Sequence, residues 1–268
     1  MNFKKHFRLI PGDRLRLAKW DPTDTLDFKD KEEAQGLLER DIKRLDELQY
    51  LLAADSRQAL LVILQGMDTA GKDGTIRHVM SACSPQGCQA SSFKVPSLEE
   101  SNHDFLWRVH QRVPPNGWIG IFNRSHYEDV LVPKVHGLVS DKQIKERYKQ
   151  INHFEKMLSQ NGVTIIKFFL NISKSEQKKR LEERIRDPRK RWKISPQDVL
   201  ERKFWHSYRK AYEYALEKCN TEEAPWYIIP SDHKWFRNIA VAKIIVQTLE
   251  QMKLRIRPPE VDISKIRL

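Results

Sequence analysis

A glycine-rich segment of the chain, GMDTAGK at Gly66–Lys72, has the spacing G-x-x-x-x-G-K of a phosphate-binding P-loop. The two glycines allow backbone conformations in which successive N–H groups turn inward onto phosphate oxygens. Lys72 would hold the bridging and terminal phosphates, and the helix expected to begin there would add its positive N-terminal end. The alternative is a strand-to-helix turn that binds no nucleotide. The predicted phosphate-binding residues are Gly66, Met67, Thr69, Ala70, Gly71, Lys72, Asp73, Gly74 and Thr75.

Two carboxylates distinguish this loop from its common form. Asp73 stands where the usual motif has the Ser or Thr whose hydroxyl binds Mg²⁺, and Asp68 lies inside the loop itself. A carboxylate among phosphates is best explained as a metal ligand or an acid/base group, because Mg²⁺ commonly takes one or two carboxylates together with phosphates and water. We therefore expect a carboxylate-held Mg²⁺, with Mn²⁺ as a substitute. The alternative is an ordinary surface Asp in a turn.

A second polar cluster, NRSHYED, begins at Asn123 directly after an apolar run. Ligands of doubly wound folds lie at the carboxyl ends of strands, so this cluster is expected to face the loop. Arg124 is suited to clamp a phosphoryl group, and its alternative role is a structural ion pair. Glu128 and Asp129 would bring further carboxylates to the phosphate site. His126 is expected to be a packing or hydrogen-bonding imidazole rather than a catalytic one.

A strongly basic segment lies between Glu176 and Lys193, with nine basic and four acidic residues. Asp187 and Pro188 interrupt it. Such a segment is typical of the mobile lid of a nucleotide kinase, which closes over phosphates and excludes water. The alternative is a solvated helix face supported by ion pairs one turn apart. A polyanionic partner favours the lid.

Short apolar runs alternate with segments of helical periodicity, which predicts βαβ units. The run Ala59–Leu64 before the loop is typical of a strand buried on both faces of a parallel sheet. The expected fold class is therefore α/β, an open and mostly parallel sheet with helices on both faces. Further buried strands are expected at Ser91–Val95, Trp118–Phe122, Val163–Leu170 and Trp226–Ile229, and helices at Asp30–Ala54, Gly74–Ala82, Leu98–Arg112, Asp141–Ser159, Lys174–Ile185, Pro196–Lys218 and Trp235–Met252.

The composition restricts the class of protein. The chain has 268 residues and a formal net charge of +12, from 48 Lys and Arg against 36 Asp and Glu, so a polyanionic partner is expected. The longest apolar run has six residues, too short to span a bilayer, and neither a secretory signal nor a C-x-x-C is present. These features favour a cytoplasmic protein. We expect one domain over residues 1–268, with an arm (1–30), a lid module (174–200) and a tail (253–268).

Seven stretches of the chain, in a fixed order, are more specific to one protein family than a P-loop alone would be. They are QGMDTAGKDGTIRHV (Gln65–Val79), SFKVPS (Ser92–Ser97), DFLWRVH (Asp104–His110), IFNRSHYEDVLV (Ile121–Val132), KFFLNISKSEQKKRLEERI (Lys167–Ile185), KRWKIS (Lys190–Ser195) and APWYIIP (Ala224–Pro230). Their order and spacing, over about Leu37 to Met252, resemble the family-2 polyphosphate kinases, which move phosphoryl groups between inorganic polyphosphate and nucleotides.

The resemblance implies a P-loop fold similar to thymidylate kinase, with a helical lid and Mg²⁺-dependent transfer. It also implies roles for individual residues: Asp68 would work with the metal, Lys72 and Arg124 would hold nucleotide phosphates, and the lid would contact polyphosphate or nucleotide through Arg180, Arg184, Arg191 and Lys193. Many relatives carry Asp at the position of Asn123. The variant FNRSHYE, with Glu128 as a second metal ligand, resembles the branch that phosphorylates both nucleoside mono- and diphosphates.

The expected reaction is reversible transfer of the terminal phosphoryl group of polyphosphate to AMP or ADP, with guanine nucleotides as further acceptors. One alternative is an ATP-dependent nucleoside monophosphate kinase, and another is a non-catalytic polyanion or nucleic-acid binder. The carboxylates around the phosphate site argue against a simple anion binder. Neither nucleic acid nor membrane is expected as a partner, whereas a homo-oligomer (dimer or tetramer) is expected, with the arm and the tail free to wrap a neighbouring subunit.

Overall fold

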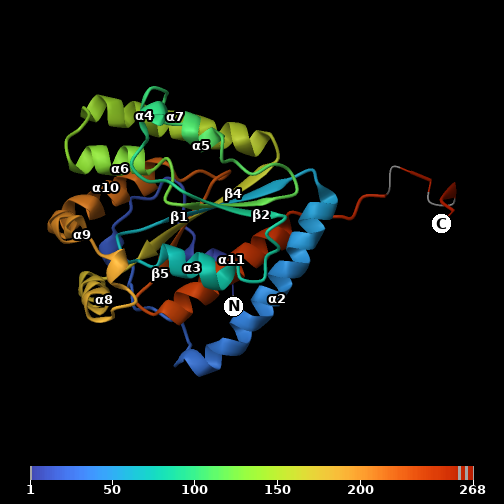
Figure 1. Ribbon diagram of the computed structural model, residues 1–268, viewed down its shortest axis with the longest axis horizontal. Helices are drawn as coiled ribbons and strands as arrows, with labels where there is room; N and C mark the ends of the chain where they lie inside the picture. Colours follow the sequence, from blue (N-terminus) through green and yellow to red (C-terminus); the bar gives the residue numbers. More distant parts are fainter. Residues whose placement is uncertain (1, 259–260, 263–264, 268) are drawn as a thin grey trace.

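A single sheet of five parallel strands forms the centre of the computed structural model, which describes residues 2–258, 261–262 and 265–267. The strand order is β2-β3-β1-β4-β5, which together with the loop after β1 is the arrangement of a P-loop kinase-like fold. The bounds are β1 Ala59–Gln65, β2 Cys88–Ser92, β3 Ile119–Asn123, β4 Val163–Asn171 and β5 Trp226–Pro230. Figure 1 shows helices on both faces of this sheet, as the alternation of apolar runs and helical segments predicts.

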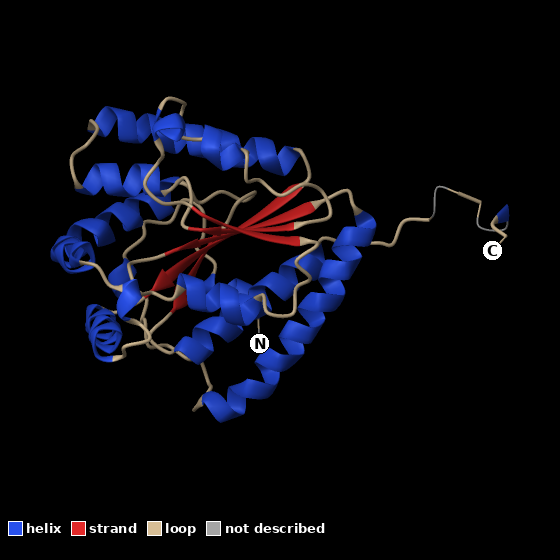
Figure 2. Cartoon of the chain, viewed as in Figure 1, coloured by secondary structure: helices blue, strands red, loops and turns tan. Residues whose placement is uncertain are grey.

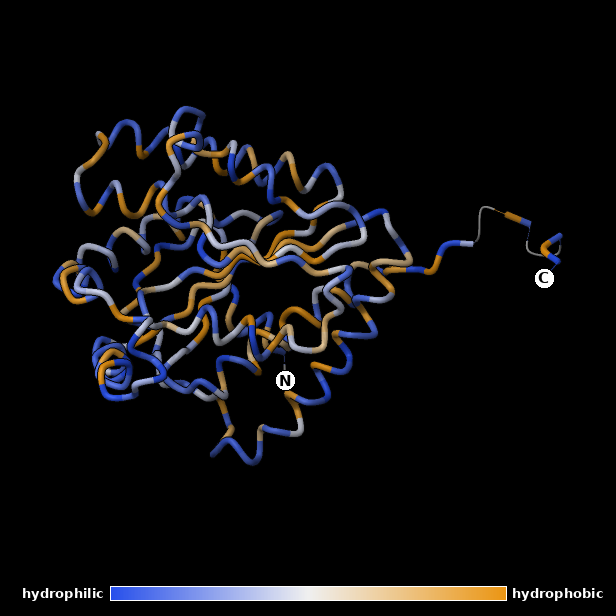
Figure 3. Tube along the Cα trace, in the orientation of Figure 1, coloured by the Kyte–Doolittle hydropathy of each residue, from blue (hydrophilic) through white to orange (hydrophobic). Residues whose placement is uncertain are grey.

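The central strand β1 is buried along its whole length, as its uninterrupted apolar sequence predicts. Successive side chains of a strand point to opposite faces. Leu60, Val62 and Leu64 therefore pack into the larger of two apolar clusters, while Leu61 and Ile63 pack into the smaller one. Figure 3 shows the resulting concentration of apolar residues along the strands.

Two helical layers cover the sheet, and Figure 2 shows them on either side of the strands. One layer contains α2, α3 and α11, and the other contains α6, α7 and α10. The helices of the described chain are α1 Phe3–Phe7, α2 Lys31–Asp55, α3 Lys72–Val79, α4 Leu98–Ser101, α5 Trp107–His110, α6 Glu128–Val135, α7 Asp141–Gln160, α8 Lys174–Arg186, α9 Pro196–Glu201, α10 Trp205–Lys218 and α11 Lys234–Gln251, with 3₁₀ turns η1 Leu17–Lys19, η2 Arg191–Lys193 and η3 Arg202–Phe204.

Two of the expected helices are interrupted. The expected helix Leu98–Arg112 consists of α4 and α5, because the Asp104 carboxylate accepts a hydrogen bond from the Leu106 backbone N–H and holds a turn between them. The expected helix Pro196–Lys218 is divided into α9 and α10 by the 3₁₀ turn η3. Strand β2 begins three residues earlier than expected, and it is not buried, because it lies at the edge of the sheet.

Helix α6 was not predicted, and it contains Pro133. A proline inside a helix removes the hydrogen bond to the carbonyl four residues before it. That carbonyl belongs to Asp129, and it accepts a hydrogen bond from Arg147 Nη1 of α7 at 2.5 Å instead. The side chain from a neighbouring helix therefore satisfies the group that the proline leaves unpaired.

The N-terminal arm packs on its own chain rather than standing free to wrap a neighbour. Phe3 and Phe7 of α1 are buried against Phe236 of α11, and the Leu9 backbone N–H donates to the Trp226 carbonyl at the edge strand β5. The arm thus covers that edge. Residues 253–258 of the tail lead away from the sheet (Figure 1), and the rest of the tail lies partly outside the described residues. The division of the chain into domain, arm, lid module and tail stays a prediction.

Within the described residues, no helix combines the length and apolar character needed to cross a membrane.

Candidate active site

The glycine-rich loop connects the buried strand β1 to helix α3, as the sequence predicts. Gly66 has φ +154° and Gly71 has φ +107°, backbone conformations that residues other than glycine rarely adopt. A Cβ on Gly66 would lie 2.8 Å from the Leu170 carbonyl oxygen. Lys72 Nζ donates hydrogen bonds back to the Gly66 carbonyl at 2.8 Å and the Met67 carbonyl at 3.3 Å. The loop is therefore closed around its own lysine.

The ammonium of Lys72 is poorly solvated. Its side chain is buried, and this desolvation, together with the charge of Arg124, lowers the pKa of Lys72 from 10.5 to about 8. The carboxylates of Asp68, Glu128 and Asp73 act in the opposite direction. One further cation and three carboxylates thus act on the ammonium of Lys72, an arrangement suited to receiving a charged ligand.

Arg180 of α8 supports the loop from behind. Its guanidinium donates to the Thr69 carbonyl at 3.0 Å, the Ala70 carbonyl at 3.2 Å, the Ser231 carbonyl at 2.6 Å and the Asp232 carbonyl at 2.9 Å. Its Nε donates to Glu176 at 2.8 Å. In this structure Arg180 is therefore a buried clamp on the loop and not a free cation of the lid; its predicted contact with phosphate stays a prediction.

Arg237 of α11 is a second buried arginine at the loop, and sequence reasoning missed it. Its Nη1 donates to the Ala70 carbonyl at 3.3 Å and lies 1.8 Å from where a Cβ on Gly71 would stand. Burial and the neighbouring Arg180 lower the pKa of Arg237 to about 9. The available signal was a charged residue close before the apolar run Ile239–Ala242 of α11. The two arginines add positive charge beneath the loop.

The end of β3 faces the loop, as expected. Asn123 Nδ2 donates to Asp73 Oδ1 at 2.6 Å, so the two residues that depart from common patterns interact directly. Arg124 adopts φ +63° and its backbone N–H donates to the Leu64 carbonyl at 3.0 Å. Its side chain is partly exposed, with Nη1 3.4 Å from Glu128 Oε2. Glu128 is the first residue of α6 and lies near Gln65, which also reaches Ser125 and Tyr212.

Asp129 does not join the carboxylates at the loop, contrary to the sequence-based expectation. Its side chain forms an ion pair with the buried Arg108 at 3.1 Å. Glu128 and Asp129 are consecutive residues in a helix, so they point about 100° apart, and only Glu128 is directed towards Arg124. Asp129 therefore has a structural role.

A buried ionic network supports the segment after β3. His126 is fully buried with Nε2 3.2 Å from Glu155 Oε1, which confirms its expected hydrogen-bonding role. Lys167 Nζ contacts Glu155 Oε2 at 2.5 Å and the Tyr127 hydroxyl at 2.9 Å. The charge of Lys167 contributes to lowering the pKa of Glu155 although burial opposes it. Sequence reasoning missed Glu155 and Lys167. The network fixes the backbone next to Arg124.

A cavity of about 950 Å³ lies between the loop and the basic segment. Arg184 of α8 reaches into it, with Nη1 3.5 Å from Asp68 Oδ2, and Lys193 lies beside the exposed ring of Trp192. Arg191 does not line the cavity; its Nε donates to the Ile185 carbonyl at 3.0 Å. The basic side chains that do line it are Lys72, Arg77, Lys94, Arg124, Arg180, Arg184, Lys190, Lys193 and Lys234, and the acidic ones are Asp68, Asp73, Glu183 and Asp198.

The carboxylates can supply part of a metal site. Asp68 Oδ2 is enclosed and accepts no hydrogen bond within the described part of the chain. Among those residues, no three His, Cys, Asp or Glu side chains converge in a group that could hold a metal ion. A hard cation held by Asp68 would therefore need further oxygen ligands from phosphate and water, which is the usual coordination of Mg²⁺. Glu128, the other expected ligand, is not among the residues that line the cavity.

Residues 28–257 match the model of a protein family described as Polyphosphate kinase 2. The chain belongs to the polyphosphate kinase 2 family. An "AMP/ADP-polyphosphate phosphotransferase" of Meiothermus ruber is 47% identical, over 98% of each chain. An "ADP-polyphosphate phosphotransferase" of Rhodopseudomonas palustris is 43% identical, over 93% of this chain and 91% of its own. The crystal structure of Polyphosphate Kinase 2 from Arthrobacter aurescens superimposes with a TM-score of 0.94, at 43% identity over 98% of this chain and 94% of the other.

Membership of the polyphosphate kinase 2 family confirms the resemblance seen in the seven stretches, and it makes the chain a phosphotransferase. The matched residues include the loop, the end of β3 and the whole basic segment. The alternative of a non-catalytic polyanion binder finds no support in these relatives.

Proposed function

We propose that this polyphosphate kinase 2 chain transfers the terminal phosphoryl group of inorganic polyphosphate to AMP and ADP, and catalyses the reverse reaction. In the forward direction a phosphate oxygen of AMP or ADP bonds to the terminal phosphorus of polyphosphate. The bond from that phosphorus to the bridging oxygen of polyphosphate breaks at the same time, and the shortened polyphosphate leaves. Guanine nucleotides are proposed as further acceptors.

The observation that carries the proposal is the cavity between the loop and the basic segment. Nine basic side chains line it against four acidic ones, and its volume is about 950 Å³. This surplus of basic over acidic side chains suits two phosphate-bearing ligands bound together, a nucleotide and the end of a polyphosphate chain. In phosphoryl transfer the protein mainly positions the reactants and stabilises developing charge.

The chain's own residues divide this work. Backbone N–H groups of the loop and the ammonium of Lys72 hold phosphates, while Arg180 and Arg237 keep the loop carbonyls in place. Arg124 clamps the transferring group from the opposite side. Arg184, Lys190 and Lys193 neutralise the polyphosphate chain when the lid closes.

Mg²⁺ is proposed as the metal, with Mn²⁺ as a substitute, because the enclosed oxygen of Asp68 and the carboxylate of Glu128 are ligands that a hard cation prefers. When bound, the ion would neutralise charge on the phosphates. An ion held by Asp68 would replace the contact of Asp68 with Arg184, and the Arg184 guanidinium would then be available to phosphate.

A donor–acceptor matrix tests the function. AMP, ADP, GMP and GDP are each incubated with polyphosphate or ATP, with Mg²⁺ present or chelated, and products are separated by chromatography. We expect ATP from ADP and polyphosphate only with Mg²⁺, and much less of that product from Asp68→Asn than from the wild type. Better phosphorylation of AMP with ATP than with polyphosphate would favour the alternative, an ATP-dependent nucleoside monophosphate kinase. No product from polyphosphate would contradict the proposal.

We further propose that the protein acts in the cytoplasm as a homo-oligomer, a dimer or a tetramer. Its three cysteines are free, which suits a reducing compartment. Light scattering of the purified protein tests the oligomer, with a monomeric mass contradicting it. Cell fractionation tests the location.

A further inference from the structure

A second cavity lies on the other side of helix α6, between α6, α7 and α10. Its volume is about 460 Å³, within the range of small-molecule sites. It shares no lining residue with the cavity at the loop. Its floor is apolar, with Ile144 and Ala211 buried. The phosphotransfer reaction proposed above makes no use of it.

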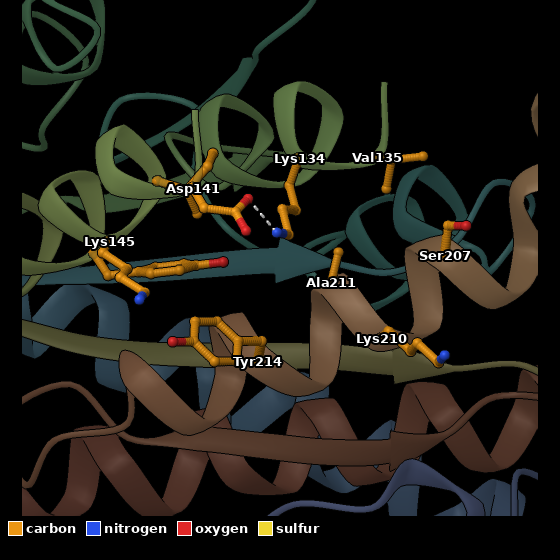
Figure 4. A pocket seen from close by; sticks show the side chains of 10 residues that line it. Lys134, Val135, Asp141, Lys145, Ser207, Lys210, Ala211 and Tyr214 are labelled. Atoms are coloured by element: carbon orange, nitrogen blue, oxygen red, sulfur yellow. Dashed lines mark hydrogen bonds and ion pairs between the residues drawn. The ribbon is translucent and has the colours of Figure 1, made fainter. Parts of the chain in front are cut away.

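Three lysines surround this cavity. Lys134 is paired with Asp141 at 2.5 Å. Lys145 and Lys210 form no hydrogen bond or ion pair with any described residue. Figure 4 shows them on opposite sides of the cavity with the Lys134–Asp141 pair between them. Three ammonium groups against one carboxylate leave a local surplus of positive charge, which an anion of charge −2 would neutralise.

Two tyrosines give the cavity an aromatic wall. The ring centroids of Tyr148 and Tyr214 are 5.5 Å apart with their planes inclined by 53°. The Tyr148 side chain is buried, at 4% exposure, yet its hydroxyl has no hydrogen-bond partner within the described chain. Burial also raises the pKa of Tyr148, so the hydroxyl stays protonated and can donate. A buried donor without a partner is costly, and a ligand oxygen would remove that cost.

We propose that the cavity between α6, α7 and α10 is a second ligand site, which binds an aromatic phosphate monoester of the size of a nucleoside monophosphate. The phosphate lies between Lys145 and Lys210, a ligand oxygen accepts a hydrogen bond from the Tyr148 hydroxyl, and the aromatic ring packs against Tyr214 and the apolar floor.

The site is placed to affect the lid. Val135 lines the cavity, and the next residue, His136, has Nε2 3.0 Å from Glu201 Oε2 at the end of α9. Ser207 lines it from α10, and the next residue, Tyr208, donates to the same Glu201 oxygen at 2.9 Å. A ligand held between α7 and α10 therefore contacts α10, one of the two elements that hold Glu201 at the end of α9.

Lysine acetylation tests the site directly, without an activity measurement. The full-length protein is treated briefly with acetic anhydride, with and without AMP, and the acetylation of each lysine is measured by mass spectrometry. We expect AMP to lower acetylation of Lys145 and Lys210 at least threefold and to leave Lys142, an exposed lysine of α7 outside the cavity, unchanged. Protection should persist in Lys72→Ala, because that variant alters the other cavity.

Two further arms identify the ligand chemistry. Adenosine lacks the phosphate and inorganic phosphate lacks the ring, so each should protect at least tenfold less effectively than AMP. Tyr148→Phe removes only the hydroxyl, and it should raise the AMP concentration for half-maximal protection at least threefold, whereas Lys142→Ala should not.

Three outcomes would overturn the proposal. The first is no protection of Lys145 and Lys210 at saturating AMP. The second is equal protection by inorganic phosphate, which would exclude recognition of the aromatic ring. The third is acetylation that depends on protein concentration but not on AMP, which would make the cavity an interface between copies of the chain. None of these outcomes bears on the donor–acceptor matrix, so the site and the proposed activity can fail separately.

Discussion

At Gly71 the space that a side chain would need is already occupied by Arg237. Gly71→Ala would place a Cβ 1.8 Å from Arg237 Nη1 at a φ of +107°. We expect the free energy of unfolding to fall by about 2–3 kcal/mol, from backbone strain and displacement of the arginine. We also expect kcat/KM to fall by at least roughly tenfold, because the N–H groups of the loop would be misplaced. Urea denaturation and steady-state kinetics measure the two effects.

Gly36→Ala is the matched control for that change. Gly36 lies inside helix α2, and nothing lies within 4 Å of a Cβ built there. We expect this variant to be more stable by about 0.5–1 kcal/mol, because alanine loses less backbone entropy in a helix. Equal effects of the two substitutions on stability and on kcat/KM would show that the loop does not require glycine at position 71.

The lowered pKa of Lys72 predicts a pH dependence. The folded protein holds this proton with a pKa of about 8, below the value of 10.5 for the unfolded chain. Between these pH values the unfolded chain binds more protons, so the contribution of Lys72 to stability rises with pH. Phosphate binding has the opposite dependence, since it needs the ammonium form. We expect kcat/KM to fall about tenfold per pH unit above pH 8.

The pH profile of kcat/KM between pH 6 and 10 measures this effect. Asp68→Asn removes a carboxylate that raises the pKa of Lys72, so in the residual activity of that variant the decline should begin at lower pH. A wild-type profile that stays flat to pH 10 would contradict the assignment.

At the scale of elements, helix α8 carries both arginines that face the cavity and arginines that face solvent. Arg184 lines the cavity and lies 3.5 Å from Asp68, whereas Arg186 has a highly exposed side chain whose one ion pair within the described chain is with Glu182 at 3.6 Å. We expect Arg184→Met to lower kcat/KM with polyphosphate by about tenfold or more, because a charge-assisted contact in the site is lost. Arg186→Met should change it less than about twofold, as exposed pairs contribute little.

Steady-state kinetics with polyphosphate as donor compare the two variants, and circular dichroism checks that both keep their helices. Equal losses in the two variants would mean that the segment acts only through its total charge. In that case α8 would not be the part of the lid that contacts phosphate.

The sequence pattern predicted some helices and strands of the fold but not others. Buried strands such as β1 were predicted well, because a parallel strand covered on both faces needs an uninterrupted apolar run. Helix α6 was missed because Pro133 argues against a helix, and only the Arg147 side chain of α7 compensates for the lost hydrogen bond. The break between α4 and α5 depends on one local hydrogen bond to Asp104, which periodicity does not register.

At the scale of the whole molecule, the net charge of +12 predicts salt sensitivity that depends on the length of the donor. Salt screens charges beyond about 10 Å at 0.1 M. A long polyphosphate extends over more of the basic surface than tripolyphosphate does. We expect the KM for long polyphosphate to rise at least about fivefold between low and moderate salt, and the KM for tripolyphosphate to rise less than about twofold.

Kinetics at about 50 and 300 mM potassium chloride, with Mg²⁺ activity held constant, measure this difference, because the screening length falls through about 10 Å within that range. An equal rise for both donors would place all of the relevant charge within the cavity at the loop.

The sequence by itself determined the α/β class, the glycine-rich loop between β1 and α3, and the family, because these depend on local spacing and on the order of motifs along the chain. It also brought together correctly the residues at the ends of β1 and β3, since the carboxyl ends of parallel strands share one edge of the sheet.

Only the tertiary structure decided which charged residues face the ligand. Arg180 turned out to clamp backbone carbonyls, Asp129 to pair with Arg108, and Arg237 of α11 to lie beneath the loop and donate to the Ala70 carbonyl. The physical reason is that a side chain's direction and desolvation depend on residues far away in the chain. Spacing predicts that a charge is present, whereas packing determines what that charge can do.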